Sequence, residues 1–246
     1  MRKKTCYTII LVLFLILSEL IAIITQITVK DTTPITSAPT RLKQSSTKIN
    51  FVWIDIGRAK LTFKPQEGYN NKFKNSVIAM SKLQDIQIPP DEVFSFNKST
   101  DLLSPKVDSI YYPGYDIVEE LVPAGGICSV SVLIASGANN ALFQFVDLDG
   151  TTINKPIGHR DYFELYHRTE MVDGINVTNI DATVATAVDK NSNAYSLNDV
   201  RFKNTSGKTI SLKFDWDFTT DMLSAATPYK RNNDPVSMTV HIKALQ

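Results

Sequence analysis

The sequence predicts an α+β domain, with two helices early in the chain and an antiparallel sheet late. Three observations predict this class. Apolar residues recur at helical spacing over residues 70–84. They do so again over residues 127–145, directly after a pair of glycines. Beyond these segments the sequence changes to short runs rich in β-branched and aromatic residues, and turn residues separate the runs.

Short strands are expected around the first helix. Two of them fall at residues 51–56 and 60–63, on either side of Gly57. The helix at 70–84 gathers its apolar residues on one face, and these are Phe73, Val77, Met80 and Leu83. Prolines at 89 and 90 end anything helical. An extended stretch is then expected at 93–96, followed by mostly loop at 101–124 with a strand near 116–122.

The second predicted helix, residues 127–145, presents two lines of side chains. Its apolar line comprises Val130, Ile134, Ala138, Ala141 and Phe145. Its polar line comprises Ser129, Ser136, Asn140 and Gln144.

The late part of the chain predicts strands. Asp149-Gly150 is a two-residue hairpin signal between strands at 145–148 and 151–153. Further strands are expected at residues 182–188, 200–202, 210–214 and 236–242.

Composition sets limits on the function. The 246 residues include 26 basic and 25 acidic ones, for a net charge of +1. No nucleic-acid partner is expected, because phosphate binding needs clustered Lys and Arg. A hydrophobic content of 43% excludes global disorder. We expect a membrane segment at residues 1–29, a flexible linker rich in Thr, Ser, Pro and Lys at 30–49, and one domain at 50–246.

The N-terminal segment predicts export across a membrane. A basic cluster, Arg2 to Lys4, precedes an apolar stretch at residues 7–29 that is long enough to cross a bilayer as a helix. The basic end is expected to stay in the cytoplasm, with the domain outside. Two interpretations remain open. An uncleaved single-pass anchor in the cytoplasmic membrane is favoured because no small-x-small cleavage site follows, whereas Glu19 within the stretch favours a cleaved signal peptide and a secreted domain.

Two cysteines, Cys6 and Cys128, are expected on opposite sides of this membrane. They therefore cannot pair within one chain. Cys128 is predicted to be an unpaired, reactive thiol in an exported domain.

Cys128 lies at the predicted start of the second helix, behind Gly125 and Gly126, which permit a tight turn. In a first helical turn the backbone N–H groups and the helix dipole favour the thiolate, the nucleophilic form of cysteine. The N–H groups of Cys128 and Ser129 are expected to stabilise an oxyanion. The alternative is that Cys128 is a small buried apolar residue.

A thiol nucleophile needs a base and a group that orients the base. The three histidines are His159, His167 and His241. We assign the base to His167 and the orienting carboxylate to Asp181. The alternatives are a surface polar role for His167 and a turn carboxylate at the start of a strand for Asp181. His159 is a second candidate, as base or substrate contact, and His241 is expected to be structural because it alternates on a strand.

Six motifs in a fixed order strengthen this interpretation. They are PDEVFSFN at 90–97, GY at 114–115, LVP at 121–123, GGICSVS at 125–131, DATV at 181–184 and RFKN at 201–204. Through them, about residues 70–214 resemble the VanW family of bacterial cell-envelope proteins. The sequence differs from the family pattern at Ala124, where the family has glycine, and at Ser129, where it has glutamine.

The resemblance implies work on peptidoglycan. Some VanW-type domains act as L,D-transpeptidases, which form an acyl-enzyme between a cysteine and a stem peptide. We therefore expect Cys128, His167 and Asp181 to be catalytic. Substrate contacts are expected from Gly125, Gly126, Ser129, Ser131 and His159. No metal or other cofactor is expected, and the oligomeric state is left open. The alternative is a non-catalytic module that binds stem peptides or an envelope partner.

Overall fold

The computed structural model describes residues 52–63, 70–115, 121–158, 169–188, 191, 193–223 and 235–246. The chain divides into two compact units, Met1–Ile49 and Asn50–Gln246, and all described residues belong to the second. The predicted membrane segment at 7–29 and the linker at 30–49 lie outside the described residues. Among the described residues, no helix combines the length and the apolar composition needed to cross a membrane.

The larger antiparallel sheet joins the beginning of the domain to its end. Its strands are β1 (Trp53–Phe63), β14 (Val236–Leu245), β13 (Ile210–Trp216) and β2 (Gln87–Ile88), in the order β1-β14-β13-β2. The two short strands expected around Gly57 form one strand, β1, whose register shifts between Asp55 and Gly57. A Cβ on Gly57 would lie 2.5 Å from the carbonyl oxygen of Gly137, so the glycine lets β1 approach a helix closely.

A second antiparallel sheet contains β3 (Val93–Ser95), β12 (Arg201–Lys203), β6 (Gln144–Val146) and β7 (Thr152–Ile153), in the order β3-β12-β6-β7. The pairing of β6 with β7 confirms a hairpin around Asp149-Gly150, but the predicted two-residue connection was wrong, because the strands end at Val146 and begin again at Thr152. Phe202 on β12 pairs with Phe94 and Phe145. Its ring stacks on Phe94 at 4.9 Å and on Phe143 at 5.3 Å between centroids, which gives this sheet an aromatic inner face.

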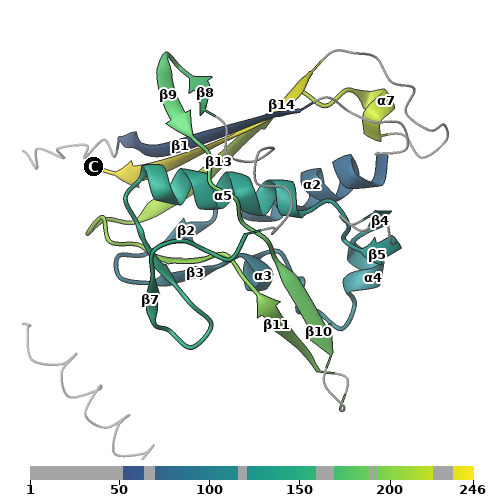
Figure 1. Ribbon diagram of the computed structural model, residues 1–246. Helices are drawn as coiled ribbons and strands as arrows, with labels where there is room; N and C mark the ends of the chain where they lie inside the picture. The colour runs from purple at the N-terminus through teal and green to yellow at the C-terminus, as the bar shows by residue number, and fades with distance from the viewer. Residues whose placement is uncertain are drawn as a thin grey trace, which may run out of the picture. The chain divides into compact units, whose positions relative to one another are not determined.

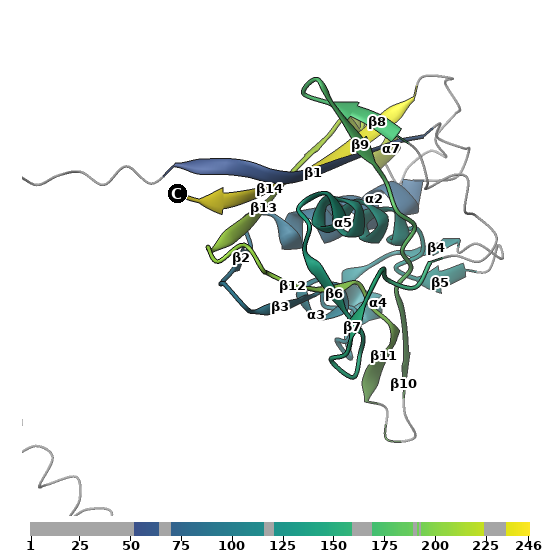
Figure 2. The same ribbon diagram turned by 60° about the vertical axis from the view of Figure 1, so that its left-hand side comes forward.

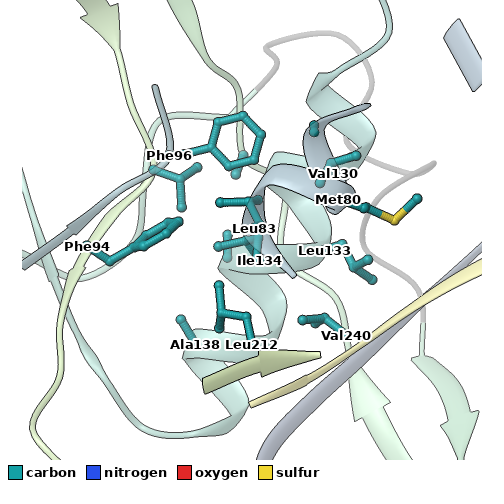
Figure 3. Packing of buried hydrophobic residues seen from close by; sticks show 14 of the residues in the cluster. Met80, Leu83, Phe94, Phe96, Val130, Leu133, Ile134, Ala138, Leu212 and Val240 are labelled. Carbon is teal, nitrogen blue, oxygen red and sulfur yellow. The ribbon is translucent and has the colours of Figure 1, made fainter. Parts of the chain in front are cut away.

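Two helices, α2 (Asn70–Leu83) and α5 (Cys128–Asn140), lie between the two sheets (Figures 1 and 2). Three helices of four residues each also occur, α3 (Phe96–Ser99), α4 (Val107–Ile110) and α7 (Thr220–Leu223). One apolar cluster joins both long helices to both sheets (Figure 3), and its labelled members include Met80, Leu83, Phe94, Ile134, Leu212 and Val240. The predicted α+β class with an antiparallel sheet is confirmed for the described domain.

Helix α5 is enclosed by its neighbours. Every residue from 130 to 138 is buried, including the two serines in that stretch. A helix that is apolar on all sides belongs in an interior. The prediction that it extends to residue 145 was wrong. The chain leaves the helix after Asn140, Leu142 adopts a φ of 59°, and Phe145 belongs to β6.

The other sheets among the described residues are three two-stranded hairpins. They are β4 (Pro113–Tyr115) with β5 (Leu121–Pro123), β8 (Thr169–Val172) with β9 (Ile175–Thr178), and β10 (Ala185–Val188) with β11 (Ala194–Asn198). The β10–β11 hairpin projects away from both helices in the two views (Figures 1 and 2). The strand predicted at 182–188 begins only at Ala185, and residues 181–184 belong to no strand.

A carboxylate fixes the turn from β3 into α3. Asp199 accepts hydrogen bonds from the Ser95 hydroxyl at 2.6 Å and from the Asn97 backbone N–H at 2.9 Å. Burial outweighs these bonds and raises the pKa of Asp199 above its ordinary value. The folded state therefore binds the Asp199 proton more tightly than the unfolded chain does.

We expect Asp199→Asn to change how stability depends on pH. The contribution of wild-type Asp199 is fully present below its unfolded pKa, about 3.9. It is lost as the pH rises through the higher folded value, and the asparagine variant lacks this loss. Urea unfolding of both proteins from pH 2 to 7 measures the difference. Asp149→Asn is the control of opposite sign, because backbone and side-chain bonds from Thr151 lower the pKa of Asp149. Parallel pH curves for wild type and Asp199→Asn would contradict the assignment.

Candidate active site around Cys128

A tight turn delivers the chain into α5. Gly125 N–H bonds the carbonyl of Val122, and Ile127 N–H bonds the carbonyl of Ala124, each at 3.2 Å. Two residues of the turn are left-handed, Ala124 with a φ of 60° and Gly126 with a φ of 90°. A left-handed alanine is strained and a glycine is not. This conformation is a physical reason for the glycine that the VanW pattern has at position 124.

Gly125 serves a different purpose from its neighbours, since it permits two backbone segments to touch. A Cβ on Gly125 would lie 2.1 Å from the carbonyl oxygen of Gly114, and a Cβ on Gly114 would lie 2.6 Å from the carbonyl oxygen of Gly125. Gly114 belongs to β4, which pairs with β5 directly before the turn. The two glycines, both in predicted motifs, therefore hold the turn against the β4–β5 hairpin.

Asn75 on α2 fastens both sides of this contact. Its amide group donates to the carbonyls of Tyr112 at 2.9 Å and Gly125 at 3.0 Å, and its carbonyl accepts from Tyr112 N–H at 2.9 Å. The side chain is fully buried. One turn earlier on the same helix, Asn71 donates to the carbonyl of Pro113 at 2.7 Å. Helix α2 thereby positions the turn that precedes Cys128.

Cys128 is the first residue of α5, as the sequence predicted. It is a reduced thiol and is half-buried, so it is neither sealed in the core nor fully exposed. Its Sγ lies 3.7 Å from the Thr183 hydroxyl and 3.9 Å from the Val184 carbonyl oxygen, both within hydrogen-bonding reach of sulfur. The last two residues of the DATV motif therefore contact the thiol.

The chain from Thr178 to Val184, here called the 178–184 segment, lies along α5 in the opposite direction. Polar side chains of the helix fix it. Ser131 donates to the carbonyl of Ala182 at 3.1 Å, and the Ser136 hydroxyl accepts from Ile180 N–H at 2.9 Å. The Asn140 amide approaches the Thr178 carbonyl at 3.5 Å. Ser136 and Asn140 belong to the polar line predicted on the helix, and these contacts explain why a buried helix has such a line.

Asp181 lies within this segment and is buried, with 5% of its surface exposed. A Cβ on Gly158 would lie 2.6 Å from the Asp181 Oδ2 atom, so the chain at 158 passes directly against the carboxylate. The neighbouring Ile157 carbonyl accepts a bond from Thr183 N–H at 2.8 Å. Residues 157–158 therefore pack against residues 181–183, and Thr183 of this stretch contacts the thiol.

Two predicted site residues, His159 and His167, lie outside the described residues. His241 is described and belongs to β14. Its Nδ1 lies 3.0 Å from Asp55 Oδ2, and its Nε2 lies 3.7 Å from Asp215 Oδ2. These partners fit the structural role expected for it.

One group among the described residues, Asp55, Asp173 and His241, brings possible metal-ligand atoms within 4.8 Å of one another. The Arg58 guanidinium already bridges the two carboxylates, at 3.4 Å from Asp55 and 3.3 Å from Asp173. A metal ion would have to displace this cation. The group is therefore described as an ion-pair network on the sheet.

Ser129 has local partners. Its hydroxyl donates to the Gly126 carbonyl at 2.9 Å and lies 3.3 Å from the Ser76 hydroxyl. Its backbone N–H, expected at an oxyanion, makes a long bond of 3.4 Å to the same Gly126 carbonyl. Ser131 bonds the Cys128 carbonyl at 2.8 Å in addition to Ala182. Both serines thus build the start of the helix, together with Gly125 and Gly126.

Sequence reasoning missed Thr183, Val184 and Asn75 as parts of the site. For Thr183 and Val184 a signal existed, since they belong to the DATV motif. Asn75 appeared as one of several polar residues on the outer face of an amphipathic helix. Its burial results from the β4 and β5 segments that pack over that face.

Comparison with known families gives one match. A family model described as VanW like protein covers residues 71–224, a span that includes α2, the turn, Cys128 and the 178–184 segment. No curated protein and no solved structure matches the chain.

Proposed function

This chain belongs to the VanW family, which indicates a protein related to the cell envelope, and from this premise we propose that it is a cysteine acyltransferase acting on peptidoglycan stem peptides. The observation that supports the proposal is the half-buried Cys128 thiol at the N-terminus of α5, in contact with Thr183. Helix N-termini favour the thiolate. We further propose that residues 7–29 anchor the protein in the cytoplasmic membrane, with the domain outside.

The reaction has two steps. In the first, the Cys128 sulfur attacks a stem-peptide carbonyl carbon, the C–N bond breaks, and the leaving amine takes the proton that the base removed from the thiol. In the second, an acceptor amine attacks the thioester, loses a proton to the base, and forms the new amide while the thiol is restored. The steps balance without a redox partner.

We propose His167 as the base and Asp181 as the residue that orients it. His159 is the second candidate, because it is bonded directly to Gly158, and Gly158 packs against the Asp181 carboxylate. A base must reach the proton it removes, directly or through one water.

A binding module without catalysis is the second candidate function. The observation that favours it is the engaged Ser129 N–H, which bonds Gly126 where an oxyanion donor was expected. Such a module would hold stem peptides without forming a covalent bond to Cys128.

Cys128→Ala separates the two candidates. A Cys6→Ser background leaves Cys128 as the sole cysteine. In that background, intact-mass analysis after incubation with a β-lactam or an activated stem-peptide mimic is expected to show one added acyl group. Cys128→Ala, with an unchanged circular dichroism spectrum, is expected to show none. His167→Ala and His159→Ala are compared in the same assay, and the base variant is expected to acylate at least about 100-fold more slowly.

Retention of the stem-peptide mimic by both proteins without any mass increase would contradict acyl transfer and support the binding module.

A further inference from the structure

We propose that the Thr183 hydroxyl is a catalytic group that donates a hydrogen bond to the ionised Cys128 sulfur. This inference rests on the proposed function, in which the Cys128 thiolate is the nucleophile. The contact itself is the 3.7 Å separation between Thr183 Oγ1 and Cys128 Sγ.

The protonation state of the sulfur decides which partner it uses. A neutral thiol has one proton, and the Val184 carbonyl at 3.9 Å can only accept it. A thiolate has no proton to give, so it needs a donor, and the carbonyl then faces a negative charge. Between these two groups, only the hydroxyl of Thr183 can donate a hydrogen bond. The two contacts therefore have opposite effects. The Val184 carbonyl favours the thiol, and the Thr183 hydroxyl favours the thiolate.

Hydrogen bonds hold the peptide group that joins Ala182 to Thr183, and so the backbone that carries the hydroxyl, in place. Thr183 N–H bonds the Ile157 carbonyl at 2.8 Å, and the preceding residue, Ala182, accepts a bond from Ser131 at 3.1 Å. Ser131 itself also bonds the Cys128 carbonyl at 2.8 Å. Threonine is stiff at χ1 because of its branched Cβ. The Thr183 side chain therefore loses little conformational freedom when the sulfur ionises.

The test is the pKa of Cys128 in the full-length Cys6→Ser protein, measured as the pH dependence of alkylation by iodoacetamide. Thr183→Val keeps the shape of the side chain and removes the donor. Hydrogen bonds to charged groups contribute enough to shift a pKa by about one unit or more. We expect the midpoint for Thr183→Val to rise by about one pH unit, and alkylation well below the midpoint to slow about tenfold.

Three variants complete the design. Thr183→Ser retains a hydroxyl and is expected to titrate like wild type. Thr183→Ala removes the donor without adding a methyl group in its place and is expected to repeat the shift, which covers the case in which the valine variant fails to fold. Thr186→Val makes the same substitution at an exposed position three residues further along, and no shift is expected.

Equal midpoints for wild type and both donor-free variants would overturn the inference. So would a shift that Thr183→Ser shares with them. No peptide substrate is present in this measurement. Failure here therefore leaves acyl-adduct formation at Cys128 untouched, whereas absence of an adduct would leave the Thr183 shift intact.

Discussion

Gly125→Ala is expected to destabilise the domain by about 3 kcal/mol or more. The added Cβ would lie 2.1 Å from the carbonyl oxygen of Gly114, which is a backbone atom, so no side chain can rotate away to relieve the clash. Overpacking of a rigid interior costs about 1–3 kcal/mol, and backbone clashes lie at or beyond the upper end. Gly125 lies three residues before Cys128, so the rate of alkylation of the Cys128 thiol is also expected to change in this variant. Urea unfolding followed by circular dichroism gives the free energy.

Gly150→Ala is the control that separates a clash from backbone strain. Gly150 has a φ of 90°, but a Cβ there meets nothing within 4 Å. The cost is then the left-handed conformation alone, about 1–2 kcal/mol. Gly125 is the opposite case, because an added Cβ would clash there but the backbone is not left-handed. A loss at Gly125 no larger than that at Gly150 would show that β4 yields easily, contrary to our interpretation.

Asn75→Ala is expected to cost about 3–5 kcal/mol. The change removes three hydrogen bonds, of which the one to Gly125 is buried and the two with Tyr112 are partly buried. It leaves the Tyr112 N–H and the carbonyls of Tyr112 and Gly125 without this partner. Each buried polar group left unsatisfied costs about 1–3 kcal/mol. The carbonyls would also be released to move. We therefore expect faster proteolysis near the β4–β5 hairpin as well as a lower midpoint in urea.

Asn71→Ala tests whether burial is the reason. Asn71 makes one bond, to Pro113, from a partly exposed position on the same face of α2. Water can replace that bond, so a loss of about 1 kcal/mol or less is expected. Equal losses of stability in the two variants would contradict the claim that the three hydrogen bonds of Asn75 stabilise the domain more than the single bond of Asn71.

The sequence predicted the first helix closely and the second only at its start. Helix α2 has an apolar face and a polar face, and such periodicity defines its ends well. Helix α5 is buried on every side from residue 130 to 138, so its apolar content continues into the buried Phe143 and Phe145 of the next segment without a break in pattern. Leu142 marks the true end only through its left-handed φ.

The order of the strands in the sheet could not be predicted from local sequence patterns. Alternation predicted the strands that became β13 and β14, but pairing β14 with β1 joins residues from the two ends of the domain. Nothing within either strand specifies that partner. The start of the strand expected at 182–188 was wrong for a related reason. Residues 181–184 pack along α5 instead of pairing in a sheet.

The candidate site was predicted in part. Paired glycines before an apolar run placed Cys128 at a helix start, and the structure agrees. The contact with Thr183 depends on the direction in which the 178–184 segment runs over the helix. Ser131 and Ser136 set that direction by bonding the segment, and sequence patterns indicated no partner for either serine. The assignment of His167 or His159 as base stays a prediction.

The position of β14 has a consequence for how the polypeptide acquires its shape. This strand lies between β1 and β13, and it is made after both of them. Until residues 236–245 leave the ribosome, β1 has no hydrogen-bonded neighbour in this sheet and its inner residues, such as Leu61, have no finished layer to join. Late closure of so long a loop is slow. A nascent chain with this strand order therefore stays unfolded around β1 until β14 has been synthesised.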